Sequence, residues 1–332
     1  MSERADTTEQ ALHVPLFTGL WDDAALFPPG NAPMAEAVPA HRLYRTEWFA
    51  EFVRYFLVGA GHVDDLVGLA DPEAPLRVVL VAPGGPTTVG SGVRTIMDTF
   101  GLLLEGIEVA GDGEIGKAVA VLHEHLPEMT AGYVEVLKGA GLDADLDNLA
   151  GTYGRPKFRT GGTAAHAFPD EAELAAFVHG CRIRELPFKV TAGLHNAVRH
   201  TDPTTGFEHH GYLNLMLATH HAVAGADPDA LADVLAIRDS AELARMTHRL
   251  TLQQRTRLRG YLTSYGTCSV AEPLQDALTL GLLTEPSRPQ GSDESPLTSG
   301  PGPDSGPESG PESGPDPEPN EPSPPRGSNL GA

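Results

Sequence analysis

The sequence predicts a (β/α)8 barrel of the TIM type, and three observations support this. Short apolar runs alternate with helix-like segments eight times over roughly 270 residues, the count and length that such barrels need. The sixth and seventh runs flank one helix-like segment, which makes a βαβ unit with parallel strands. More residues separate the seventh and eighth runs than one helix requires. We therefore expect an extra helical insertion before the last strand.

Five strands and five helices are expected in the first half of the chain. Trp21 begins a short apolar strand that Pro28 and Pro29 stop, and the glycines at 59 and 61 end the second strand. The expected strands are 21–30, 52–58, 76–81, 106–110 and 132–137, and the expected helices are 34–44, about 62–69, about 92–103, 116–126 and 143–150.

The second half continues the alternation. The sixth strand, 155–162, and the seventh, 187–195, each contain lysine and a glycine near the end, and a helix from Asp170 to Arg184 joins them. The remaining expected elements are a helix at 211–224, further helix to about 259, a strand at 262–270 and a helix at 273–283.

The chain has 332 residues and a net charge of −22, and this acidity argues against nucleic acid as a partner. No apolar run reaches the roughly 18 residues of a membrane span, and residues 1–10 lack the apolar segment of a secretory signal. Two cysteines, Cys181 and Cys268, imply no disulfide framework. We expect a cytoplasmic protein without a membrane partner, whose oligomeric state is open and includes a homo-oligomer.

Residues 285–332 differ from the rest in composition. They repeat Ser-Gly-Pro-Glu/Asp and contain nine acidic residues and two arginines, with almost no apolar side chains. Such a segment cannot offset the entropy of ordering. We therefore expect a barrel domain at 1–284 and a disordered acidic tail at 285–332, which serves as a solubilising spacer or as a partner-binding segment.

Charged residues interrupt four of the expected strands. Lys157 and Arg159 are two apart and so share one face of their strand, and Lys189 lies in the next strand. Glu108 and Glu135 each alternate with apolar neighbours. A charge on the helix-facing side would be buried in an apolar layer at high cost, so we expect all five side chains to meet inside the barrel. They would form either a catalytic site or a structural ion network.

Glycines and hydroxyl residues follow the sixth, seventh and eighth strands. Barrel enzymes often bind phosphate at the last two of these positions, where backbone N–H groups can donate to an anion. The alternative is a set of tight turns without a ligand. The candidate substrate-binding residues are Arg159, Thr160, Gly161, Thr191, Gly193, Gly266, Thr267 and Ser269.

Histidines cluster after the seventh strand. His195 lies at the strand end and is the best candidate for a general acid or base, because imidazole titrates near neutral pH. The others are His200, His209, His210, His220 and His221. Their spacing does not favour a metal helix, so no metal and no cofactor is expected. Cys268 is either a nucleophile or, more in keeping with its small apolar side chain, a packing residue.

A glycine motif offers a competing interpretation. Residues 111–116 match G-x-G-x-x-G between a strand and a helix, and Glu135 lies near the position of a ribose-binding acid. However, three strands precede this unit, and acidic residues within the loop would repel a pyrophosphate. An ordinary βα turn is favoured over an NAD site.

Several runs together resemble an uncharacterised bacterial family: Leu26-Phe27-Pro28-Pro29, residues 157–162, residues 187–195, residues 210–214 and residues 266–269. That resemblance implies no activity. More loosely, lysines on the sixth and seventh strands are similar to those of class I aldolases of the deoxyribose-phosphate aldolase type. This resemblance implies that Lys157 forms a Schiff base and that Lys189 lowers its pKa. Phe158 and Arg159 depart from that family, which has small hydroxyl residues after its lysine.

The sequence therefore predicts a barrel enzyme that acts on a small phosphorylated or carboxylated carbonyl compound, with a Schiff-base aldolase or lyase as the leading hypothesis. Lys157, Lys189, Glu135, Glu108 and His195 are the predicted catalytic residues. Two alternatives remain open. One is a cofactor-free isomerase that uses a glutamate and His195, and the other is a barrel that binds an anionic metabolite without catalysis.

Overall fold

The structure is a computed structural model that describes residues 16–128 and 130–286. The tail expected at 285–332 lies outside the described residues, apart from its first two positions. No helix in the described part of the chain is both long enough and apolar enough to cross a membrane.

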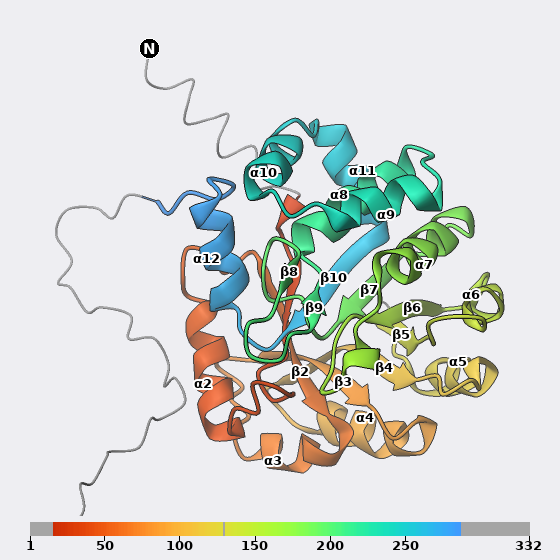
Figure 1. The fold of residues 1–332 in the computed structure, drawn as a ribbon. Coiled ribbons are helices and arrows are strands. Elements are labelled where there is room, and N and C mark those ends of the chain that lie inside the picture. The colour runs from red at the N-terminus through yellow and green to blue at the C-terminus, as the bar shows by residue number, and fades with distance from the viewer. Residues whose placement is uncertain (1–15, 129, 287–332) are drawn as a thin grey trace, which may run out of the picture. The chain divides into compact units, whose positions relative to one another are not determined.

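Eight parallel strands close into a barrel in the order β1-β10-β7-β6-β5-β4-β3-β2, and helices surround it (Figure 1). The predicted (β/α)8 fold is confirmed. The barrel strands are β1 (Trp21–Asp23), β2 (Val53–Gly59), β3 (Leu76–Ala82), β4 (Leu102–Ala110), β5 (Ala131–Glu135), β6 (Gly154–Arg159), β7 (Phe188–Thr191) and β10 (Leu262–Thr267). A short antiparallel pair, β8 (His200–Thr201) and β9 (Glu208–His209), follows β7.

The extra helical insertion is also present, as α9 and α10 between α8 and α11. The helices are α2 (Met34–Tyr44), α3 (Val63–Val67), α4 (Val89–Asp98), α5 (Ile115–His125), α6 (Leu142–Leu149), α7 (Glu171–Ile183), α8 (Tyr212–Val223), α9 (Pro228–Ala236), α10 (Ser240–His248), α11 (Leu252–Tyr261) and α12 (Ala271–Thr279), with 3₁₀ turns at Ala60–His62, Pro86–Thr88 and Ala165–Ala167.

Six predicted elements had wrong boundaries. Two of them end early, because the sixth strand ends at Arg159 instead of residue 162 and the last helix ends at Thr279 instead of residue 283. The first strand ends at Asp23, whose Oδ1 accepts a hydrogen bond from Ala25 N at 3.1 Å and turns the chain. The helix expected at 92–103 is α4, which ends at Asp98, because residues 102–104 begin β4 instead. The strand expected at 187–195 is β7, which ends at Thr191, since Ala192 and Gly193 have positive φ angles of 62° and 77°. The last strand ends at Thr267 instead of residue 270.

Helix α7 shows why the charges of β6 and β7 face inward. A capping box between Asp170 and Glu173 begins this helix. Its Phe177 ring stacks on Phe158 of β6 at 4.4 Å and packs edge-on against Phe188 of β7 at 5.1 Å. Phe158 therefore occupies the helix-facing side of its strand. The residues beside Phe158 and Phe188 then face the barrel interior by the two-residue period of a strand.

The apolar residues form two separate clusters. The large one lies between the barrel wall and the helices and contains Val78 and Leu80 of β3. The small one contains Ala24, Leu57, Val79 and Val81, and partly buried Phe27 and Tyr55 pack against it. Because Val79 and Val81 alternate with the helix-facing residues of β3, the small cluster lies in the barrel interior. The part of the interior lined by Leu57, Val79 and Val81 is thus apolar.

Candidate active site

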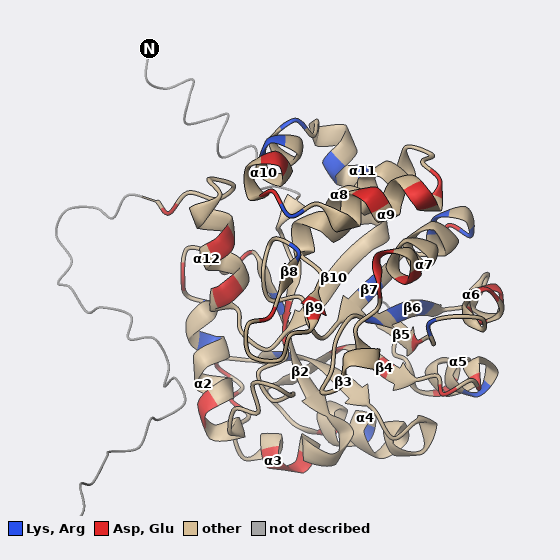
Figure 2. Ribbon diagram, viewed as in Figure 1, with Lys and Arg blue, Asp and Glu red and all other residues tan. Residues whose placement is uncertain are grey.

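Six charged side chains of alternating sign form a continuous series inside the barrel, which we call the charge chain. Its members in order are Asp22, Lys189, Glu108, Lys157, Glu135 and Arg159. Five of these are the residues that the sequence predicted to meet, and the structure brings them together. With three carboxylates and three cations, the chain is electrically neutral. Figure 2 shows the basic residues on β6, whereas many acidic residues lie on outer helices such as α3, α9 and α12.

The inner half of the charge chain, Asp22, Lys189 and Glu108, is buried. Lys189 Nζ lies 2.7 Å from Asp22 Oδ2 and 2.5 Å from Glu108 Oε1. Each of these three side chains is only 1% exposed. Ser264 of β10 supports the inner end, because its hydroxyl donates to Asp22 Oδ2 at 2.6 Å and accepts from Arg54 at 2.8 Å. Asp22 Oδ2 therefore has two partners, Lys189 Nζ and the Ser264 hydroxyl.

The outer half of the charge chain, Lys157, Glu135 and Arg159, extends from the buried interior to the solvent. Lys157 Nζ lies 2.9 Å from Glu108 Oε2 and 3.0 Å from Glu135 Oε2. Arg159 donates to both oxygens of Glu135, from Nε to Oε1 at 2.8 Å and from Nη2 to Oε2 at 3.3 Å. Side-chain exposure increases from 5% at Lys157 to 21% at Glu135 and 47% at Arg159. The charge chain therefore opens at the carboxyl ends of the strands, where barrel enzymes carry their chemistry.

The ion pairs set the protonation states. Burial by itself would raise the pKa of Glu108, but the ammonium groups of Lys157 and Lys189 outweigh it and hold the pKa at about 2. Burial would lower the pKa of Lys157 and Lys189, yet their carboxylate partners raise both pKa values above the ordinary lysine value. The pKa of Glu135 is lowered, because Lys157 and Arg159 outweigh its burial. All four groups are therefore charged at neutral pH.

Three of the predicted substrate-binding residues, Thr160, Gly161 and Gly193, make local contacts that explain their identity. The Thr160 hydroxyl donates to Ala192 O and Thr191 O, which joins the ends of β6 and β7. A Cβ on Gly161 would lie 2.9 Å from Gly193 Cα, and a Cβ on Gly193 would lie 2.7 Å from Thr160 O. Close backbone approach therefore requires both glycines.

The predicted binding residues at the end of β10 differ in their surroundings: Thr267 and Ser269 make local hydrogen bonds, whereas Gly266 faces the barrel interior. Thr267 donates to Ser269 O at 2.8 Å, and the Ser269 hydroxyl accepts from Glu272 N at 3.3 Å in the first turn of α12. A Cβ on Gly266 would lie 3.3 Å from Thr191 Oγ1 and next to Leu57 and Ala24 of the interior. Gly266 and Thr191 therefore face the same interior as Arg159, and they are the predicted binding residues best placed for a ligand.

His195 is not part of the charge chain. It lies in a second cluster with Cys268, after β10, and Glu272, on α12. Its Nδ1 is 2.7 Å from Glu272 Oε2, and its Nε2 is 3.5 Å from Cys268 Sγ. Burial alone would lower the pKa of His195, but hydrogen bonds to Cys268 and Glu272 raise it to about 10.

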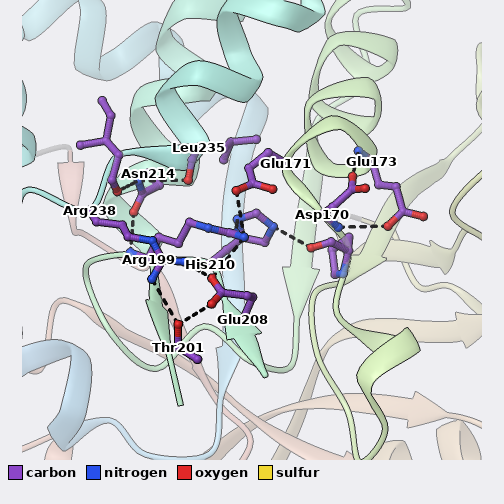
Figure 3. A network of polar contacts seen from close by, with 12 residues as sticks. Asp170, Glu171, Glu173, Arg199, Thr201, Glu208, His210, Asn214, Leu235 and Arg238 are labelled. Carbon is purple, nitrogen blue, oxygen red and sulfur yellow. Dashed lines mark hydrogen bonds and ion pairs between the residues drawn. The ribbon is translucent and has the colours of Figure 1, made fainter. Parts of the chain in front are cut away.

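A buried network, shown in Figure 3, accounts for His210 and Asn214 in the sequence run at 210–214. Arg199 contacts His210 Nδ1 at 3.1 Å and Glu171 at 2.9 Å, and His210 Nε2 donates to Pro169 O at 2.9 Å. Burial, together with the positive charge of Arg199, lowers the pKa of His210 to about 4. Asn214 accepts from Arg199 N and donates to Ile237 O. These contacts fasten the loop after β7 to α7 and to the end of α9.

Two further sequence patterns are the histidine-rich segment and the glycine motif at 111–116. Among the described residues, no group of three His, Cys, Asp or Glu side chains is arranged to hold a metal ion. In the run at 111–116, a Cβ on Gly111 would lie 2.4 Å from Glu135 O, so this glycine permits contact between β4 and β5. The Glu135 carboxylate is held by Lys157 and Arg159.

Two residues of the site could not be chosen from the sequence. Asp22 precedes Asp23 in a three-residue strand, so alternation alone does not say which one faces inward. The structure answers this, because Asp23 pairs outward with His41 of α2 at 2.9 Å. The contact of Glu272 with His195 could not be predicted, because the two residues are 77 positions apart in the sequence and no pattern relates them.

No protein-family model matches the chain, and no curated protein sequence matches it. Among solved structures, the chain is similar to UMP synthase from Leishmania donovani, at 14% identity and a TM-score of 0.38. The match covers 73% of this chain and 59% of that chain, so this chain spans less than two thirds of that protein. A likeness at this level adds nothing to what the closed barrel itself shows.

Proposed function

We propose that the protein is a barrel enzyme that performs acid–base chemistry on a small anionic carbonyl compound at the outer end of the charge chain. The observation that carries this proposal is the graded exposure of the charge chain, from two dry ion pairs to a half-exposed arginine. A network whose only role was to fill the interior would have no reason to end in a solvent-facing cation. Buried ion networks of this kind often contribute little net stability.

Arg159 is suited to bind the anionic group of the substrate. Its Nε and one terminal nitrogen contact Glu135. Among the described residues, the other terminal nitrogen has no hydrogen-bond or ion-pair partner. A planar guanidinium binds carboxylate and phosphate with several donors, so a carboxylate or a phosphate is the favoured ligand group. Thr191 and Gly266 border the same space.

Lys157 is suited to stabilise negative charge on the carbonyl oxygen. It stays protonated because Glu108 and Glu135 raise its pKa. A fixed ammonium in a poorly solvated interior stabilises a developing enolate oxygen without reorganisation. Glu135 is the carboxylate next to it and nearer the mouth, and it would accept the carbon-bound proton. These roles correspond to the cofactor-free isomerase, with Glu135 as the glutamate and Lys157 in place of His195 as its partner.

The Schiff-base aldolase is the second candidate, and it rests on the resemblance and on the register that pairs Lys157 with Lys189 on adjacent strands. A Schiff base needs a neutral amine as the nucleophile. The expected depression of the lysine pKa is not found, because the carboxylates outweigh both the burial and the neighbouring cation. Acid–base chemistry by a protonated Lys157 therefore has the better support.

The test is exchange of carbon-bound hydrogen in D2O, followed by proton NMR. Pyruvate, dihydroxyacetone phosphate and any anionic metabolite that co-purifies are incubated with the protein. We expect the proton signal of the carbon next to the carbonyl group to decay for at least one of these compounds. Lys157→Met should slow this decay by about 100-fold or more, in keeping with the loss of one preorganised electrostatic group.

Arg159→Gln should raise the half-saturating concentration, and Arg184→Gln is the matched control, since Arg184 pairs with Asp143 and Asp147 on the outer surface. Borohydride added with each compound should leave the mass of Lys157 unchanged. An irreversible mass increase there would establish the Schiff base instead. Absence of both exchange and co-purified anions would leave only the structural interpretation of the charge chain.

A further inference from the structure

We propose that Cys268, His195 and Glu272 form a second reactive site, in which the Cys268 thiolate adds reversibly to the carbonyl carbon of a small aldehyde. This site is separate from the charge chain and shares no residue with it. Its existence does not depend on the acid–base chemistry proposed above.

The three side chains have the geometry of an activated nucleophile. Cys268 Sγ lies 3.5 Å from His195 Nε2 and 3.7 Å from its Nδ1, and that Nδ1 lies 2.7 Å from Glu272 Oε2. A nucleophile beside a base, with the base oriented by a third group, is the arrangement that activates cysteine in unrelated enzymes. Here the carboxylate binds Nδ1–H, which leaves Nε2–H for the sulfur.

The placement on the barrel also suits chemistry. Cys268 follows β10, His195 follows β7 and Glu272 begins α12, so all three belong to the carboxyl-terminal side of the strands. The His195 side chain is 16% exposed and that of Glu272 is 52% exposed. Cys268 is partly buried, and Gly30 packs against its Cβ. A reagent of small size can therefore reach the sulfur, whereas a side chain at position 30 would crowd it.

The groups around the sulfur include a protonated imidazole and a carboxylate. Hydrogen bonds to Cys268 and Glu272 raise the pKa of His195 to about 10, which keeps the imidazole protonated at neutral pH and places its N–H groups beside the sulfur. The other titratable groups on the adjoining elements are Glu272 and Asp276 of α12 and His209 of β9. Asp276 is engaged by Asn196 and Ala197 N, and the pKa of His209 is lowered, first by burial. Glu272 is thus the carboxylate that acts on His195.

The chemical step needs no additional reagent. The thiolate sulfur forms a bond with the carbonyl carbon, and the C=O π electrons move to oxygen. The oxygen then takes the Nε2 proton of His195. The product is a thiohemiacetal, no group leaves and nothing is oxidised. In reverse, the neutral imidazole removes the hydroxyl proton as the C–S bond breaks.

The experiment is alkylation of the folded full-length chain by iodoacetamide, mapped by peptide mass spectrometry. An unassisted thiol loses reactivity about tenfold for each pH unit below its pKa of about 8.5. We expect Cys268 to keep a nearly constant alkylation rate from pH 9 to pH 6.5, while glutathione in the same tube slows by about 100-fold. Millimolar propionaldehyde should protect Cys268 reversibly, and propanol should not.

The chain supplies its own folding control. Cys181 is fully buried in α7, so it should stay unlabelled in every variant that remains folded. His195→Gln should slow alkylation of Cys268 at pH 6.5 at least tenfold but not at pH 9.5, and Glu272→Gln should have a smaller effect. A wild-type rate that falls with pH like that of glutathione would overturn the proposal, and this result requires no variant. Protection by propanol equal to that by propionaldehyde would refute the addition step.

Discussion

Replacing Glu108 with glutamine tests whether the interior of the barrel depends on its ion pairs. Glu108 is 1% exposed, and two ammonium groups lie 2.5 and 2.9 Å from its oxygens. The variant leaves Lys157 with Glu135 and Lys189 with Asp22 as the remaining carboxylate partners. Removing one partner of a buried ion pair costs about 3–5 kcal/mol. We expect a loss of this size in the free energy of unfolding at pH 7.

The pKa of Glu108 gives an independent figure. A fall from 4.5 in the unfolded chain to about 2 in the folded state corresponds to roughly 3 kcal/mol of stability at neutral pH. Because the folded-state pKa is the lower one, this contribution is fully present above pH 4.5 and is lost as the pH falls through about 2. The stability difference between wild type and Glu108→Gln should therefore be constant from neutral pH down to about 4.5, shrink as the pH falls further, and be lost below about 2.

Urea unfolding followed by far-UV circular dichroism measures this difference. Glu105→Gln is the matched control on the same strand, because its partner Arg77 is half exposed and the pair lies 2.6 Å apart at the surface. Exposed pairs contribute about 0–1 kcal/mol, so the control should lose little. If Glu108→Gln lost no more stability than the control at pH 7, the interior charges would be adequately solvated and the reasoning would fail.

Three further expectations concern the rest of the chain. Truncation after Thr284 should leave the melting temperature unchanged, because the removed segment has almost no apolar surface to bury; a drop of several degrees would show that it docks on the barrel. Wild-type stability should also fall as the pH drops from 6.5 to about 4, since His210 is neutral in the fold and charged when unfolded, and His210→Gln should lack this component in acid titrations of unfolding. Gly193→Ala should destabilise the fold well beyond Gly139→Ala, because both have positive φ but only the first would place a Cβ 2.7 Å from Thr160 O; equal melting temperatures would contradict this.

The arrangement of the strands was predictable because it rests on local rules. Glu108 lies between Ile107 and Val109, both buried against the helices, so alternation alone sends the carboxylate inward. The same rule worked for Lys157 beside Phe158. It failed at 102–104, where an apolar run suits a helix or a strand equally. Strand β4 begins there instead, directly after Gly101, whose φ is +94°.

The loops could not be predicted in the same way, because loop residues do not alternate between two faces as strand residues do. The glycines at 161 and 193 were interpreted as anion-binding turns, but each one's position is explained by contact with the other. His195 was chosen for its place at a strand end. Its partners Cys268 and Glu272 depend on how two loops fold over the barrel, which no sequence spacing specifies.

The two halves of the barrel interior are unlike, and this has a stereochemical consequence. Val79 and Val81 provide a hydrocarbon wall on one side, and Lys157 and Glu135 provide a charged wall on the other. A planar carbonyl group between such walls would present the same face to the ammonium group at each encounter. We therefore expect any proton that the site adds to carbon to arrive from one side, which gives a single enantiomer in a product with a new stereocentre.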